Sequence, residues 1–133
     1  MLKITRNFRE ITLYHGNNFR NDSCFVTGTR NGTVSLWKAK QVIKSAQIFN
    51  KWTLVFCKDD RIFAASKNND VVGLNMSLNV VKKFKGQDSQ PLSIDASQKY
   101  LIIGYENGHV DVHSLNELDQ NGIHQKRMAS NFL

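Results

Sequence analysis

The chain has 133 residues, of which 41% are hydrophobic and 22% are charged, and its formal net charge is +7. This composition is typical of one folded domain, and it excludes a disordered chain and a bundle of membrane-spanning helices, since no window approaches about eighteen apolar residues. The positive charge lies in the first half: residues 1–58 hold ten Lys or Arg against two acids, and residues 59–133 hold eight against nine. A basic half favours an acidic partner, and a solvated basic face without a partner is the alternative.

Residues 1–19 are expected to contribute a strand to a larger sheet, with Ile4-Thr5 as the candidate segment. The first residues carry positive charge but no apolar stretch of about seven residues, which a secretory signal requires. Cys24 and Cys57 lie in apolar runs without Cys-x-x-Cys spacing, which indicates reduced core residues. Both observations predict an intracellular, cytoplasmic protein.

Three segments share one pattern at a spacing of 38 residues, namely residues 24–37, 62–75 and 100–113. A fixed internal period of this size predicts a repeat protein. The first run of each unit is apolar on both faces and predicts a buried strand, whereas the second run alternates. The alternating apolar residues are Val34 and Leu36, Val72 and Leu74, and Val110 and Val112. The runs are joined by turn-forming pairs, Asn31-Gly32, Asn69-Asp70 and Asn107-Gly108, so each unit is predicted to contain a β-hairpin.

Two further runs complete each unit. One follows the hairpin at residues 41–43 and 79–81, and the other precedes it at residues 53–57 and 91–95. Four short strands in about 40 residues are typical of a β-propeller blade, whereas a strand solenoid usually has shorter repeats.

The predicted fold is therefore all-β: a partial β-propeller with three hairpin units over residues 20–115. Propellers close with about four to eight blades, so this number is too small for a ring. Other chains or further sequence are expected to supply the rest, and an open stack capped by another element is the alternative, because unprotected sheet edges invite aggregation. Residues 116–133 are predicted to form a flexible or partner-ordered tail.

The segment Val26-Thr-Gly-Thr-Arg-Asn-Gly-Thr-Val-Ser-Leu-Trp37 resembles the signature hairpin of the WD-repeat family, and the resemblance extends over roughly residues 20–115. The family's hairpin aspartate is replaced by asparagine, its Gly-His pair reads Gly86-Gln87, and its tryptophan position reads Trp37, Asn75 and His113. Such losses weaken a buried polar network whose members support one another. The resemblance implies a non-catalytic protein-interaction scaffold.

The run from Asp60 to Asn75 is loosely similar to the echinoderm microtubule-associated-protein-like group of WD-repeat proteins. Together with the basic first half, this similarity implies an acidic partner such as a microtubule, and a place at the cytoskeleton or cilium. The same charge excess supports an alternative function, a structural nucleic-acid-binding subunit of a ribonucleoprotein.

No catalytic, cofactor or metal site is predicted. The sequence lacks a Gly-x-Ser-x-Gly elbow, a phosphate loop and a His-Glu-x-x-His pair, which argues against an enzyme. His109 and His113 are four residues apart, but four residues of a strand span about 13 Å, too far for one metal ion. The candidate partner-binding residues are a basic strip expected to share one rim, Arg20, Arg30, Lys38, Lys40 and Lys44, and a possible aromatic anchor, Trp52.

Overall fold

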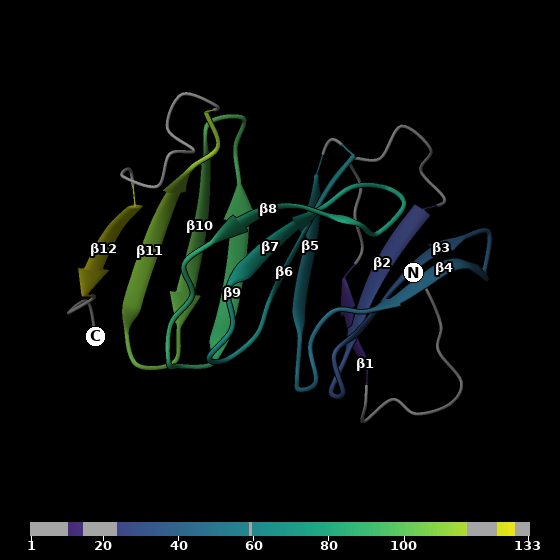
Figure 1. Cartoon of the computed structure of the whole chain (residues 1–133), viewed down its shortest axis with the longest axis horizontal. Coiled ribbons are helices and arrows are strands. Elements are labelled where there is room, and N and C mark those ends of the chain that lie inside the picture. The colour runs from purple at the N-terminus through teal and green to yellow at the C-terminus, as the bar shows by residue number, and fades with distance from the viewer. Residues whose placement is uncertain (1–10, 15–23, 59, 117–124, 130–133) are drawn as a thin grey trace.

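The computed structural model of the chain describes residues 11–14, 24–58, 60–116 and 125–129, and all regular elements in these ranges are β-strands. They form three four-stranded antiparallel sheets, each a meander of consecutive strands (Figure 1). We name the sheets blades 1, 2 and 3 in chain order. Blade 1 contains β1 (Ile11–Tyr14), β2 (Cys24–Thr29), β3 (Thr33–Lys38) and β4 (Gln41–Gln47). Blade 2 contains β5 (Leu54–Lys58), β6 (Arg61–Ala65), β7 (Val71–Leu74) and β8 (Val80–Phe84). Blade 3 contains β9 (Pro91–Ala96), β10 (Tyr100–Tyr105), β11 (His109–Ser114) and β12 (Gln125–Ala129).

Blade 2 lies between the other two and is buried on both faces (Figure 1). Ile62 and Ala64 pack in one core cluster with blade 1, and Phe63 and Ala65 pack in a second cluster with blade 3. All four side chains are at most 3% exposed. The prediction that this run is apolar on both faces because both faces are covered is therefore confirmed for blade 2.

Blades 1 and 3 share no core cluster among the described residues, so the three blades form an open stack and not a closed ring. In β10 the side chains of Leu101 and Ile103 are fully buried against blade 2, whereas Ile102 is 44% exposed. The far face of blade 3 is thus uncovered. The fold predicted from the sequence, a partial propeller of about three blades that does not close, is confirmed.

Equivalent residues of blades 1 and 2 are 37 residues apart in the sequence, and those of blades 2 and 3 are 39 residues apart. The predicted spacing of 38 residues is the average of these two values. Equivalent pairs in the central hairpins are Val26 with Leu36, Phe63 with Gly73, and Ile102 with Val112. The turn hydrogen bonds follow the same spacing, since the amides of Gly32, Asn69 and Gly108 donate to the carbonyls of Thr29, Ser66 and Tyr105. Connections of different length change the spacing without changing the sheets.

This difference corrects the alignment of the second unit. A shift of one residue moves every side chain of a strand to its other face. Val72 and Leu74 therefore pack against blade 1, whereas Val34 and Leu36 of blade 1 face forward, toward blade 2. The structural equivalent of Trp37 in blade 2 is Leu74, and not Asn75.

The hairpin turns of units 1 and 3 have the predicted geometry. Gly32 and Gly108 have φ angles of 92° and 89°, in the left-handed region that favours glycine. A Cβ atom on Gly32 would also lie 2.0 Å from the carbonyl oxygen of Phe49, so that no larger residue fits there. In unit 2 the positive φ is at Asn68, one residue before the predicted Asn69-Asp70 pair.

The first and last described strands pair with the predicted units. Within residues 1–19, β1 pairs with β2, with Leu13 opposite Thr27; the candidate segment Ile4-Thr5 lies outside the described residues. For residues 116–133 the sequence predicts a tail, and the structure contains β12 within this range, paired with β11 as the fourth strand of blade 3. β12 begins 45 residues after β8 begins, so the regular period does not reveal it.

The described residues include no helix long and apolar enough to cross a membrane.

Candidate protein-interaction site

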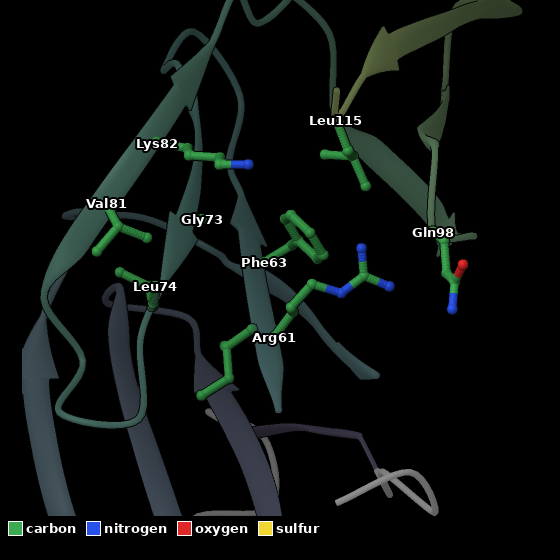
Figure 2. A pocket seen from close by; sticks show the side chains of 9 residues that line it. Arg61, Phe63, Gly73, Leu74, Val81, Lys82, Gln98 and Leu115 are labelled. Atoms are coloured by element: carbon green, nitrogen blue, oxygen red, sulfur yellow. The ribbon is translucent and has the colours of Figure 1, made fainter. Parts of the chain in front are cut away.

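A pocket of about 370 Å³ opens between blades 2 and 3. Blade 2 contributes Arg61, Phe63, Gly73 and Lys82. Blade 3 contributes Gln98, from the turn between β9 and β10, and Leu115, which directly follows β11. Figure 2 shows the Phe63 ring between the Lys82 side chain and the guanidinium of Arg61, which points toward Gln98. The pocket is therefore apolar at its base and has two cationic side chains in its lining.

The pocket arises from two differences between equivalent positions in the blade interfaces. At the interface of blades 1 and 2, Leu36 and Cys24 are 2% and 6% exposed and fill the space between the sheets. In blade 2 the equivalent positions are held by Gly73 and Arg61. A glycine leaves the volume of a leucine side chain open, and the Nη2 atom of Arg61 is buried in the interface. The second interface is consequently incomplete at this end.

The backbone around Gly73 does not demand glycine. A Cβ atom at this position would lie 3.4 Å from Cβ of Lys82 and 3.6 Å from Cε1 of Phe63, which are ordinary van der Waals contacts. Its φ angle lies outside the left-handed region. The open volume is thus a property of this sequence and is not required by the fold.

The side chains of Arg61 and Lys82 reach the pocket from different strands of blade 2, β6 and β8. The Nε of Arg61 donates to the carbonyl oxygen of Lys58 at 3.4 Å, and its guanidinium lies 5.9 Å from the centre of the Phe63 ring. Lys82 pairs in register with Gly73, so its side chain shares the face that turns toward blade 3. Phe63 is 3% exposed and forms the buried base below both.

A second candidate surface is the uncovered face of blade 3. Ile102 occupies the position that Val26 and Phe63 hold in blades 1 and 2, where those side chains are 0% and 3% exposed. Tyr100 on the same face is 50% exposed, and Val112 is half-buried. The position of Ile102 is thus core in two blades and open to solvent in the third.

The structure separates the members of the predicted basic strip. Lys38 and Lys40 lie at the turn between β3 and β4, Lys44 lies on β4, and all three are exposed. Arg30 lies in the turn between β2 and β3, at the opposite end of the hairpin, about 20 Å away for six-residue strands. Arg20 lies outside the described residues.

The two tryptophans differ in environment. Trp37 is half-buried and its indole N–H donates to Oγ1 of Thr27 at 3.0 Å, which agrees with a structural position. Trp52 is half-buried before β5, and its carbonyl oxygen accepts a hydrogen bond from Oγ of Ser66 at 2.7 Å. The structure thus places Trp52 near the Arg30 end of the hairpin, since the amide of Thr53 donates to the carbonyl of Thr29.

A buried polar pair replaces part of the expected WD-type network. Nε2 of Gln87, in the Gly86-Gln87 pair, lies 3.0 and 2.9 Å from the two carboxylate oxygens of Asp111, and it donates to them. Asp111 is 0% exposed on the face of β11 toward blade 2. On the same strand, the ring of buried His113 lies 5.1 Å from that of Phe84. These contacts link the end of blade 2 and the connection that follows it to β11 of blade 3.

No three His, Cys, Asp or Glu side chains in the described ranges are grouped closely enough to hold a metal ion. His109 is half-buried beside Asn107, and Asp60 adopts a φ of 62° in the turn between β5 and β6. Asp60 is therefore a turn residue between two strands of blade 2.

No protein-family model matches the chain, and no match was found among curated proteins. Solved structures do match. The WD40 β-propeller domain of Doa1 is 19% identical with a TM-score of 0.69, over 82% of this chain and 37% of that one. The C-terminal WD40 domain of Sif2 is 14% identical with a TM-score of 0.64, over 84% of this chain and 33% of that one.

A computationally designed protein, Ika4, is also similar, at 14% identity and a TM-score of 0.68, over 86% of this chain and 72% of that one. The chain thus spans about a third of the length of the two WD40 domains. At these identities the similarity concerns the fold alone. The chain has the fold of three consecutive blades of a WD40-type β-propeller.

Proposed function

We propose that the chain is a non-catalytic protein-interaction scaffold, and that the uncovered face of blade 3 receives a further four-stranded blade from another chain. The observation that carries this proposal is the exposure of Ile102 at a position that is buried in both preceding blades. The similarity to WD40 domains supports the scaffold role as an analogy at the level of the fold.

The expected occupant follows from the two interfaces already present. Each is formed by the forward face of one blade and an apolar rear face of the next, with Ile62 and Leu74 in blade 2 and Leu101 and Ile103 in blade 3. A further blade that carries aliphatic residues at these positions would bury Tyr100 and Ile102 in the same way. Burial of apolar surface stabilises such a contact by about 25 cal/mol per Å².

Self-association of the purified chain tests this proposal. With no other partner present, copies of the chain should associate through the uncovered face, and Ile102→Asp should raise the concentration at the association midpoint at least about tenfold. Sedimentation velocity over a concentration series measures this shift. The matched control is Ile43→Asp, because Ile43 is an isoleucine of similar exposure, 52% against 44% for Ile102, on blade 1. A chain that stays monomeric throughout, or an equal effect of both variants, would contradict the proposal.

For the partner's chemistry we propose an acidic protein surface, such as that of microtubules, in contact with Lys38, Lys40 and Lys44. The exposure of these three lysines on neighbouring positions of one blade supports this. Such a contact should be strongest at low ionic strength and should weaken as the screening length falls to about 10 Å at 0.1 M salt.

Pelleting with microtubules over a salt series measures this contact. The triple variant K38E/K40E/K44E is expected to lose most of the pelleting, while K67E/K83E/K99E, which changes the charge equally at exposed lysines of blades 2 and 3, should retain it. Absence of pelleting at low salt would overturn the proposal. Preferential binding to polyuridine RNA, with the same variant dependence, would favour the nucleic-acid alternative instead.

A further inference from the structure

The pocket between blades 2 and 3 combines three properties that restrict what it can bind. Its volume, about 370 Å³, is at the lower end of the range for ligand pockets, about 300–1,000 Å³. Its base is apolar, with Phe63 and Leu115 at 3% and 8% exposure. Its lining includes the two cationic side chains of Arg61 and Lys82, one on each side of Phe63 (Figure 2).

The equivalent location between blades 1 and 2 shows which part of this arrangement belongs to the fold. There, Lys44 pairs with Leu36 as Lys82 pairs with Gly73, and a β-bulge follows each pair. The lysine and the bulge are therefore common to both interfaces. The open volume and the second cation are specific to blade 2, because Gly73 and Arg61 stand where Leu36 and Cys24 close the first interface.

The missing leucine side chain defines the group that fits. An aliphatic or phenyl side chain inserted from outside would restore the packing that Leu36 provides in the first interface. Carboxylates beside that side chain would meet Arg61 and Lys82, which favours anions over neutral or cationic ligands. Asp60 is next to Arg61 in the chain and lies in the same turn. No acidic residue is next to Lys82 in the sequence.

An extended peptide can present this combination here. In the described sheets, β8 is the outer strand of blade 2 and pairs only with β7. The bulge places Val81, 58% exposed, at the rim of the pocket beside Lys82. An edge strand next to a pocket is the arrangement in which a peptide adds main-chain contacts while one side chain enters the pocket.

We propose that this pocket binds an acidic peptide segment of a partner protein through one large apolar side chain flanked by carboxylates. This proposal rests on the proposed scaffold function. It concerns a second surface of the chain and gives the class of partner segment that binds there. It does not need a further blade, since both walls of the pocket belong to blades 2 and 3.

Titration of the ¹⁵N-labelled chain with four peptides tests the proposal. The probe is Ser-Glu-Glu-Leu-Glu-Ser, and the comparison peptides replace its leucine by serine, its glutamates by glutamine, or both. The probe is expected to bind at least about tenfold more tightly than each comparison peptide, with the largest amide shifts around Gly73, Lys82 and Leu115. Equal binding of all four peptides, or shifts elsewhere, would overturn the proposal. Octanoate binding as tightly as the probe would also overturn it, in favour of a small anionic amphiphile.

Three variants complete the test. Gly73→Leu should reduce probe affinity at least about tenfold, because its side chain occupies the pocket as Leu36 does in the first interface. Lys82→Gln should reduce it about three- to fivefold, whereas Lys83→Gln, on the other face of the same strand, should leave it unchanged. Lys82 is partly exposed, so this variant folds even if Gly73→Leu does not. Ile102→Asp should leave probe binding intact, which distinguishes failure of the pocket from failure of the blade proposal.

Discussion

Cys57 in the folded protein should react with iodoacetamide at pH 8 at least about 30 times more slowly than in the unfolded chain. Its side chain is 0% exposed in the core between blades 1 and 2. Burial, with a smaller contribution from the nearby Cys24, raises the pKa of Cys57 from 9.0 to about 12. The reactive thiolate is then about a thousandfold scarcer at pH 8, and the greater nucleophilicity of a more basic thiolate recovers about thirtyfold at most.

The raised pKa of Cys57 also predicts how stability changes with pH. The folded state holds the thiol proton more tightly than the unfolded state, so this contribution is complete below pH 9 and is lost as pH rises from 9 toward 12. Mass spectrometry of alkylated peptides measures the labelling rate, and urea unfolding at pH 8 and pH 11 measures the stability. Cys57→Ala should show a smaller loss of stability between these pH values than the parent chain. Rapid labelling of Cys57 in the native protein would contradict its position in the core.

The sequence predicts most of the fold because the local signals agree with one another. Asn-Gly pairs between apolar runs specify the hairpins of units 1 and 3, and the double-faced apolar run of unit 2 specifies a sheet covered on both sides. The register of unit 2 could not be predicted in this way. Val71-Val72 and Ala64-Ala65 place identical side chains on opposite faces, so that the pattern fits either register equally well.

The pocket could not be predicted for the same reason. A constant period of 38 places Gly73 opposite Ser35, whereas the structure aligns it with Leu36. Only the second alignment shows that blade 2 has Gly73 at the position of the core residue Leu36 and Arg61 at the position of Cys24. The basic strip was visible as composition, but its division depends on the hairpin, which sends Arg30 and Lys38 to opposite ends of β2 and β3.

Truncation of two neighbouring residues of β10 should have very different effects on stability. Leu101→Ala is expected to lower the free energy of unfolding by about 3 kcal/mol, within the range of about 2–5 kcal/mol for buried leucines, because Leu101 is 0% exposed and packs against blade 2. Ile102→Ala should cost less than about 1 kcal/mol, since Ile102 is 44% exposed on the uncovered face. Urea unfolding monitored by tryptophan fluorescence measures both values.

The same pair of variants reports on whether blade 3 receives a further blade. When another blade covers the far face, Ile102 becomes the equivalent of Phe63, which is 3% exposed. The cost of Ile102→Ala should then rise toward that of Leu101→Ala in the assembled protein, while the cost of Leu101→Ala should stay nearly constant. Equal costs in the isolated chain would mean that both faces are already covered. If the cost of Ile102→Ala does not change with self-association, the further blade packs elsewhere. The reason is that removal of a buried apolar side chain always lowers stability.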